Sequence, residues 1–105
     1  MLDVSIHDAG SGNDGQGIVI VTVTNSTNKP VTAPVIIESN VPLNFWMDGK
    51  KLSPSPEAMI AVQATIPRVS SRKFTITWKD PTTEIKFIQM RAKFTTEKSD
   101  EIEIN

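Results

Sequence analysis

Apolar and polar residues alternate along most of this chain. The clearest case is the segment 73–79, where Phe74, Ile76 and Trp78 alternate with lysines and threonines. Successive side chains of a β-strand point to opposite faces, so a period of two is typical of a strand with one buried face. Seven further segments share this period, at residues 2–7, 18–24, 31–37, 43–47, 59–66, 85–94 and 101–104. The pattern therefore predicts about eight short strands.

The apolar face of each segment predicts which side chains form the core. No segment shows a sustained period of 3.6 residues, so no helix is expected. Within 85–94, Ile85 and Phe87 fall on the opposite face from Ile88, which predicts a bulge or a change of sheet. The side chains expected in the core are Leu2, Val4, Ile6, Val19, Val21, Val23, Val31, Ala33, Val35, Ile37, Leu43, Phe45, Met47, Ile60, Val62, Ala64, Ile66, Phe74, Ile76, Trp78, Ile88, Met90, Ala92 and Phe94.

Proline, glycine and small polar residues separate these segments. The expected turns include SNVP at 39–42, DGKK at 48–51 and PRVSSR at 67–72. Proline lacks an amide hydrogen and glycine adopts turn conformations readily, so such residues end strands. Short strands at this spacing predict a single domain over residues 1–105, an all-β immunoglobulin-like β-sandwich of about seven to eight antiparallel strands. A closed barrel is the alternative.

The stretch GSGNDG at 10–15 is a literal G-x-G-x-x-G. In dinucleotide-binding proteins this motif precedes a helix whose amino terminus binds the pyrophosphate. Here Gly17 leads into IVIVTVTN, which is rich in β-branched residues and predicts a strand. We therefore interpret the stretch as a connection between the first two strands. Asp8, Asn13 and Asp14 also lack the alternating ligand spacing of an EF-hand calcium loop.

Charge and composition narrow the function classes. The 11 basic and 12 acidic residues give a net charge of −1, which does not indicate binding to nucleic acid or to an anionic membrane. Two groups of basic residues do not change that prediction: the small cluster of Arg68, Arg72 and Lys73, and the outward-facing Lys86, Arg91 and Lys93. The chain has no cysteine, which excludes disulfides, thiolate chemistry and cysteine-based zinc sites. No apolar run approaches the roughly 20 residues of a membrane-spanning helix.

The sequence predicts no catalytic site, no cofactor and no metal site. His7, the single histidine, lies on the polar side of its segment and is interpreted as a solvent-exposed strand residue. Asp80 and Glu84 flank a turn and are interpreted as part of a solvated acidic surface. Asn25-Ser26-Thr27 matches the acceptor triplet for N-glycosylation, which also occurs often by chance.

The segment VPLNFWMDGKKL at 41–52 suggests an interaction surface. One face of it carries core positions, which leaves Trp46 on the other face beside an Asp-Gly turn. An exposed tryptophan near a sheet edge is a plausible interface anchor. A short strand at a sandwich corner can instead bury both faces. Trp46 and Leu52 are the predicted contacts and Val69 is a second candidate, because all three lie beside turns and outside the regular core positions.

The stretch GQGIVIVTVTNSTNKPVTAPVIIES resembles the second and third strands of extracellular immunoglobulin-like modules. There a V-x-V-x-N strand end, a polar turn and Pro-Val lead into the next strand, and Val21, Val23, Asn25, Pro30 and Val31 stand in those places here. The absence of cysteine and the Ile/Val/Thr/Asn-rich strands are similar to soluble domains of archaeal surface-filament proteins of the archaellum stator (FlaF/FlaG) type. Two features depart from that family: no anchor helix precedes the first strand, and the chain has no tyrosine.

This resemblance implies a non-catalytic domain at the cell surface, anchored by a membrane segment missing from this chain. Its implied partners are S-layer or filament subunits, with a homo-oligomer as a further option. A second resemblance is to the sandwich subdomain of clathrin-adaptor appendages, carried by the stretch VTNSTNKPV…IIESNVPLNF. It implies a cytosolic module that captures short peptide motifs. A carbohydrate- or ion-binding sandwich is the third hypothesis. A membrane helix upstream in the native gene would favour the surface-filament hypothesis. A melting temperature that depends on glycan or calcium would favour the carbohydrate- or ion-binding hypothesis.

Overall fold

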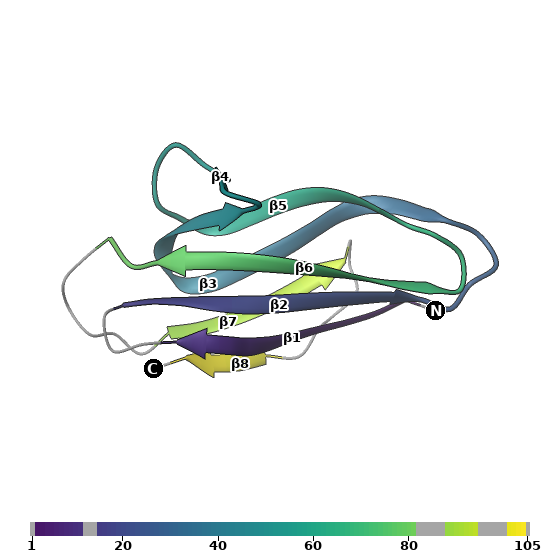
Figure 1. The fold of residues 1–105 in the computed structure, drawn as a ribbon, viewed down its shortest axis with the longest axis horizontal. Coiled ribbons are helices and arrows are strands. Elements are labelled where there is room, and N and C mark those ends of the chain that lie inside the picture. The colour runs from purple at the N-terminus through teal and green to yellow at the C-terminus, as the bar shows by residue number, and fades with distance from the viewer. Residues whose placement is uncertain (1, 12–14, 82–87, 95–100, 105) are drawn as a thin grey trace.

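The computed structural model describes residues 2–11, 15–81, 88–94 and 101–104, and every regular element in them is a β-strand (Figure 1). Strands with one apolar face must bury that face against another layer, so the chain folds into two packed sheets. The strands are β1 (Leu2–Ser11), β2 (Gln16–Asn25), β3 (Val31–Met47), β4 (Lys50–Lys51), β5 (Glu57–Ile66), β6 (Ser70–Lys79), β7 (Ile88–Phe94) and β8 (Glu101–Ile104).

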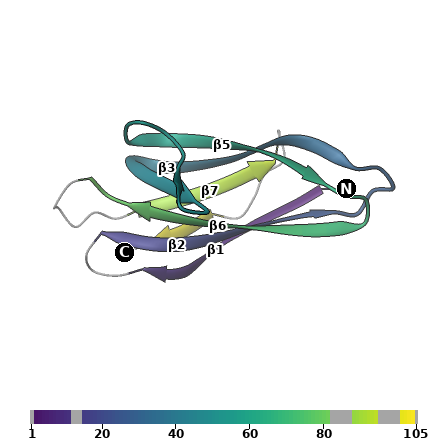
Figure 2. The same cartoon turned by 45° about the horizontal axis from the view of Figure 1, so that its top comes forward.

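All strand pairs of the two sheets are antiparallel. In sheet A, β1 pairs with β2, β2 with β6, and β6 with the end of β3, which also pairs with β4. In sheet B, β5 pairs with the first part of β3, β3 with β7, and β7 with β8. Figure 2 shows β5, β3 and β7 in one layer and β6, β2 and β1 in the other. The predicted all-β antiparallel sandwich is confirmed, with seven described strands of four residues or more.

The turn expected at 39–42 is wrong, because the chain stays extended through the whole of β3. The ladder between β3 and β5 is interrupted from Glu38 to Leu43, and beyond this irregularity β3 pairs with β6 instead. A bulge of this kind bends a strand and redirects its pairing without a turn. Pro42 lies in the interrupted segment, where the ladder to β5 needs no amide hydrogen from it. One long strand therefore belongs to both sheets, where two short ones were expected.

Most of the predicted core positions are buried between the sheets. Val31, Met47 and Val62 are only partly buried. The side chains of Leu2 and Phe94 lie outside the described ones, as do Ile85 and Phe87 with the bulge expected there. The confirmed core consists of Val4, Ile6, Val19, Val21, Val23, Ala33, Val35, Ile37, Leu43, Phe45, Ile60, Ala64, Ile66, Phe74, Ile76, Trp78, Ile88, Met90 and Ala92.

The glycine-rich stretch joins two antiparallel strands, β1 and β2, which confirms the interpretation as a connection. Gly15 has a φ of 76°, a left-handed conformation that glycine adopts without a steric penalty. Gly17 is needed for a different reason, because a Cβ there would lie 2.8 Å from Cζ2 of Trp78. These two glycines therefore serve a turn and the packing of an indole.

Candidate functional site

Trp46 lies on the outer face of sheet A beside a tight turn. It stands opposite Thr77 of β6 on one side and Lys51 of β4 on the other. In the turn between β3 and β4, Asp48 and Gly49 have φ angles of 55° and 77°. Two positive φ angles in an Asp-Gly pair are typical of a type I′ hairpin turn. The turn expected at 48–51 is thus limited to Asp48 and Gly49, because Lys50 and Lys51 form β4. The indole is partly exposed, so this corner does not bury both faces of the strand.

Leu52 lies close to Trp46 but is tied to the core. Its amide donates a hydrogen bond to the carbonyl oxygen of Phe45 at 2.9 Å. Its side chain is partly buried and packs against the core cluster. Leu52 therefore supports the corner that carries Trp46 and offers limited surface of its own.

Val69 lies at the far end of sheet A from Trp46. It occupies the turn between β5 and β6, is 69% exposed, and its amide donates to the carbonyl oxygen of Thr27 at 3.2 Å. Between the two sites β6 runs from Ser70 to Thr77, about 23 Å at 3.3 Å per residue. The structure thus brings Trp46 and Leu52 together and leaves Val69 apart from them.

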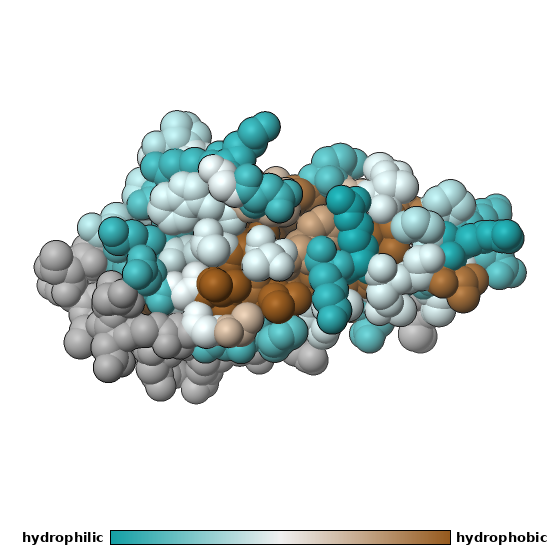
Figure 3. Space-filling model, viewed as in Figure 1, coloured by the Kyte–Doolittle hydropathy of each residue, from teal (hydrophilic) through white to brown (hydrophobic). Residues whose placement is uncertain are grey.

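Two isoleucines extend the surface around Trp46, and the sequence analysis did not single them out. Ile18, which is 38% exposed, lies opposite Thr77, and the partly exposed Ile20 lies opposite Thr75. Figure 3 shows apolar side chains gathered on this face over β2 and β6. The signal was present in IVIVTVT, where the outward positions begin with two isoleucines before the threonines. We call Ile18, Ile20, Trp46, Thr75 and Thr77 the sheet A patch.

Basic side chains lie around the sheet A patch. Lys73 and Lys79 are exposed on the same face of β6, one on each side of the two threonines. Lys51 lies opposite Trp46, and His7 of β1 lies opposite Ile20. His7 is exposed, as predicted. The patch therefore has two threonines between its isoleucines and Trp46, and its border is mainly basic.

Asn25 of the glycosylation triplet is fully buried, at 0% exposure. Its Nδ2 donates to the carbonyl oxygen of Lys29 at 2.8 Å and to those of Ile66 and Pro67 at 3.2 Å. Its Oδ1 accepts the amide of Thr27 at 2.9 Å and the hydroxyl of Thr27 at 2.6 Å. This side chain therefore joins the β2–β3 connection to the β5–β6 connection and is not accessible to a glycosyl donor in the folded chain.

Asp80 is not part of a solvated surface, which corrects its interpretation from the sequence. It is 4% exposed, and its amide donates to the carbonyl oxygen of Gly15 at 2.7 Å. The contact explains the burial, because Asp80 directly follows β6 and closes the end of the sandwich against the β1–β2 connection. Glu84 lies outside the described residues.

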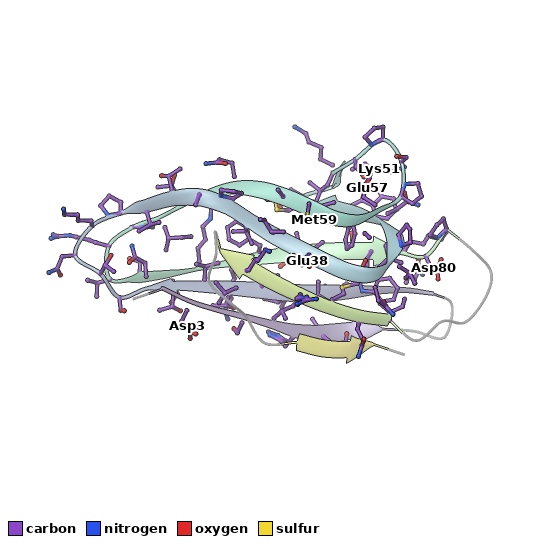
Figure 4. The ribbon with its side chains drawn as sticks, turned by 180° about the vertical axis from the view of Figure 1, so that it is seen from behind. Asp3, Glu38, Lys51, Glu57, Met59 and Asp80 are labelled. Carbon is purple, nitrogen blue, oxygen red and sulfur yellow. The ribbon has the colours of Figure 1, made fainter. Side chains whose placement is uncertain are left out.

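On the outer face of sheet B, two of the predicted outward cations share one carboxylate. Arg91 Nε lies 3.5 Å from Glu38 Oε2, and Lys93 Nζ lies 3.1 Å from Glu38 Oε1. Figure 4 shows Glu38 on this side of the molecule. The depression beside it has a volume of about 100 Å³, whereas small-molecule pockets usually have at least about 300 Å³. The depression is lined by Glu38, Ser39, Asn40, Gln89, Met90 and Arg91.

Within the described ranges, no three histidine, aspartate or glutamate side chains come together as a possible metal site. The part of the chain that the structure describes also contains no helix of the length and hydropathy needed to cross a membrane. The absence of catalysis and of a cofactor remains a prediction from the sequence.

Comparisons with known proteins identify the fold. No family model matches the chain, and no curated protein matches it. Among solved structures, BslA, described as a bacterial hydrophobin, is similar with a TM-score of 0.55 and 14% identity, over 98% of this chain and 93% of BslA. The alkylpurine DNA glycosylase AlkC of Pseudomonas fluorescens, bound to DNA containing an abasic site analog, is similar with a TM-score of 0.57 and 7% identity.

The AlkC match covers 98% of this chain but only 29% of the glycosylase. At such identities the likenesses show the fold alone. The chain therefore has a BslA-like, immunoglobulin-like β-sandwich fold, as predicted, and no family is assigned to it.

Proposed function

We propose that this chain is a non-catalytic protein–protein interaction module that binds its partner through the sheet A patch. The observation that carries the proposal is a partly exposed tryptophan in one row with Thr77 and Ile18. Tryptophan is enriched among the residues that dominate binding energy, especially where neighbouring contacts exclude water from it. Ile18 and Ile20 supply such neighbours on the same face of sheet A.

The charges around the patch indicate the chemistry of the partner. Lys51, Lys73 and Lys79 border the sheet A patch. A partner with an apolar centre and acidic residues around it would match this arrangement, and the opposite charges would speed association and fix the orientation. Salt would then slow association more than it weakens the apolar contact.

For the biological setting we propose the one that the sequence resemblance implies. The chain would be the extracytoplasmic domain of a membrane-anchored archaellum or pilus component, and its partner an S-layer or filament subunit. The stretch that supports this setting spans β2 and the start of β3. The cysteine-free sandwich is compatible with it.

The test is retention of partners on the immobilised chain. Separate surface-layer and cytosolic fractions of the source cells are passed over the wild type, Trp46→Lys and the control Thr24→Lys. Thr24 is also partly exposed on the outer face of β2, but it lies outside the sheet A patch. We expect a surface subunit to be retained by the wild type and the control, and at least tenfold less by Trp46→Lys.

We expect Trp46→Lys to have a melting temperature close to that of the wild type, because the side chain of Trp46 lies outside the core cluster. The retention result counts only if this is so. Equal retention by all three variants would contradict the proposal. Retention of short cytosolic peptides without any surface subunit would favour the adaptor-like alternative.

A further inference from the structure

We propose that the free side of β5 pairs with β5 of a second copy of this chain, so that sheet B continues across a two-fold symmetric dimer. β5 pairs with β3 on one side, and none of the described strands pairs with its other side. A strand with a free side presents unpaired amide and carbonyl groups, which are a template for another strand. This surface is separate from the sheet A patch.

The other described edges carry features that discourage strand addition. β6 pairs with β3 only from Thr77 to Lys79, and the part of β6 before these residues exposes Arg72 and Lys73. β1 exposes Asp3, His7 and Asp8, and its register shifts between Asp8 and Gly10. β4 consists of two lysines. β8 is four residues long, and two of them are glutamates. Charges, bulges and short length are the usual protections of an edge strand.

β5 has none of these protections along most of its length. It is ten residues long, and its one ionisable residue, Glu57, stands at its first position. It contains neither proline nor glycine, and its register with β3 is regular from Met59 to Ile66. Its outward side chains beyond Met59 are the exposed Ala61, Gln63 and Thr65, which are small or uncharged. A second strand can therefore approach without a charge or a bulge in its way.

Apolar surface is also left uncovered at the middle of β5. Val62 points to the core side, but it is only partly buried, whereas Ile60 and Ala64 on the same side are 5% and 3% exposed. Met59 is 58% exposed on the outer side, where Figure 4 shows it on β5. A strand added at this edge would cover Val62 and give the free backbone groups partners.

The symmetry of the pairing favours a second copy as the occupant. A two-fold axis perpendicular to the sheet makes the two β5 strands antiparallel and keeps core-side residues on the same side. Each residue then stands opposite one that is an even number of positions away in the sequence. With the axis at residue 61 Glu57 would face the uncharged Thr65, and with the axis at residue 62 or 63 it would lie beyond the end of the partner's β5. The edge is therefore complementary to itself, with no like charges opposed.

The first test is the mass of the full chain by sedimentation equilibrium. We expect it to rise with concentration from the 11.5 kDa of one copy to twice that value. The double variant Ala61→Lys/Gln63→Lys places like charges opposite each other and should weaken the dimer at least tenfold. Ala61→Glu/Gln63→Glu should do the same, and an equimolar mixture of the two variants should restore a dimer. This restoration separates an edge contact from simple loss of folding.

The second test uses the natural absence of cysteine, so that an introduced thiol can form a disulfide only between two copies. Directly opposite strand residues have Cα atoms about 5 Å apart, within disulfide range. If the two-fold axis passes residue 61, Ala61→Cys alone should cross-link. If the axis passes residue 63, Gln63→Cys alone should cross-link, and if it passes residue 62, only a mixture of the two variants should. Thr75→Cys, exposed on sheet A, is the control and should remain uncross-linked.

A mass that stays at 11.5 kDa up to about 1 mM chain would overturn the dimer. A dimer that survives both lysine substitutions on β5 but is lost in Trp46→Lys would place the contact on sheet A and also overturn it. Because Trp46→Lys leaves the β5 edge intact and Ala61→Lys/Gln63→Lys leaves the patch intact, failure of this proposal is distinguishable from failure of the proposed function.

Discussion

Gly17 of β2 stands directly opposite Trp78 of β6, and the indole of Trp78 occupies the space that a side chain on Gly17 would take. A Cβ at position 17 would lie 2.8 Å from Cζ2 and 2.9 Å from Cε2 of Trp78, closer than carbon atoms pack. Trp78 is 2% exposed and holds one end of the core. The glycine at position 17 is therefore explained by packing.

Gly17→Ala should destabilise the sandwich. Added atoms in a packed core cost about 1–3 kcal/mol, because neighbours must leave their preferred positions. For a domain of this size each kcal/mol lowers the melting temperature by about 4–8 °C. Thermal unfolding followed by circular dichroism measures the shift.

The same substitution should cost less in a Trp78→Phe background, because phenylalanine lacks the second ring of the indole. Part of the cost should remain, because the new Cβ would also lie 2.7 Å from the carbonyl oxygen of Gly10. Trp78→Phe also removes a buried indole N–H that has no hydrogen-bond partner among the described residues. A double-mutant cycle measures the coupling between the two positions. Strictly additive free energies of unfolding would contradict the proposed contact.

Asn25→Ala should lower the free energy of unfolding by about 2–3 kcal/mol, because it leaves buried carbonyl and amide groups without partners. Urea unfolding measures the loss. Thr24→Ala, which removes only the exposed hydrogen bond of 2.8 Å between Thr24 Oγ1 and Ser71 Oγ, is the matched control and should cost much less. A chain secreted by a glycosylating host should also carry no glycan at Asn25, and a glycan on folded chain would contradict the burial.

Val69→Asn should stabilise the chain by about 1 kcal/mol. Val69 has a φ of 49°, a region that costs L residues about 1–2 kcal/mol and is tolerated best by glycine and asparagine. Alanine does not tolerate this positive φ as asparagine does, so Val69→Ala should raise the free energy of unfolding by less. Equal stability of the valine and asparagine forms in urea unfolding would show that the turn relaxes in solution.

Glu38→Gln should change stability by at most about 1 kcal/mol, because its two ion pairs are close to solvent. The side chains of Arg91 and Lys93 are 59% and 37% exposed. The difference between the two forms should shrink as salt rises from about 0.01 to 1 M, over which the screening length falls about tenfold. A large loss that salt does not reduce would instead indicate a structural role for Glu38.

Much of the fold could be predicted from the sequence, because most strands carry a strict alternation. Phe74, Ile76 and Trp78 are buried as their spacing requires. The path of β3 could not be predicted in the same way. Asn40 and Pro42 are typical of a turn, and only the pairing of Leu43 and its neighbours with other strands keeps this segment extended.

The candidate site was partly predictable. Trp46 falls on the outward face because the alternation places Leu43 and Phe45 in the core. Ile18 and Ile20 are distant from it in sequence, and only the order β2–β6–β3 brings them to the same face. The burial of Asp80 and the free side of β5 also depend on which strands become neighbours, which local periodicity does not determine.

The most direct test of the central claim is the affinity of the purified surface subunit for the wild type and for Trp46→Lys, with Thr24→Lys as control. A residue that dominates an interface contributes 2 kcal/mol or more, so we expect Trp46→Lys to raise Kd by about 30-fold or more while the control stays close to the wild type. A Kd for Trp46→Lys within about threefold of the wild type would show that the sheet A patch is not the binding surface.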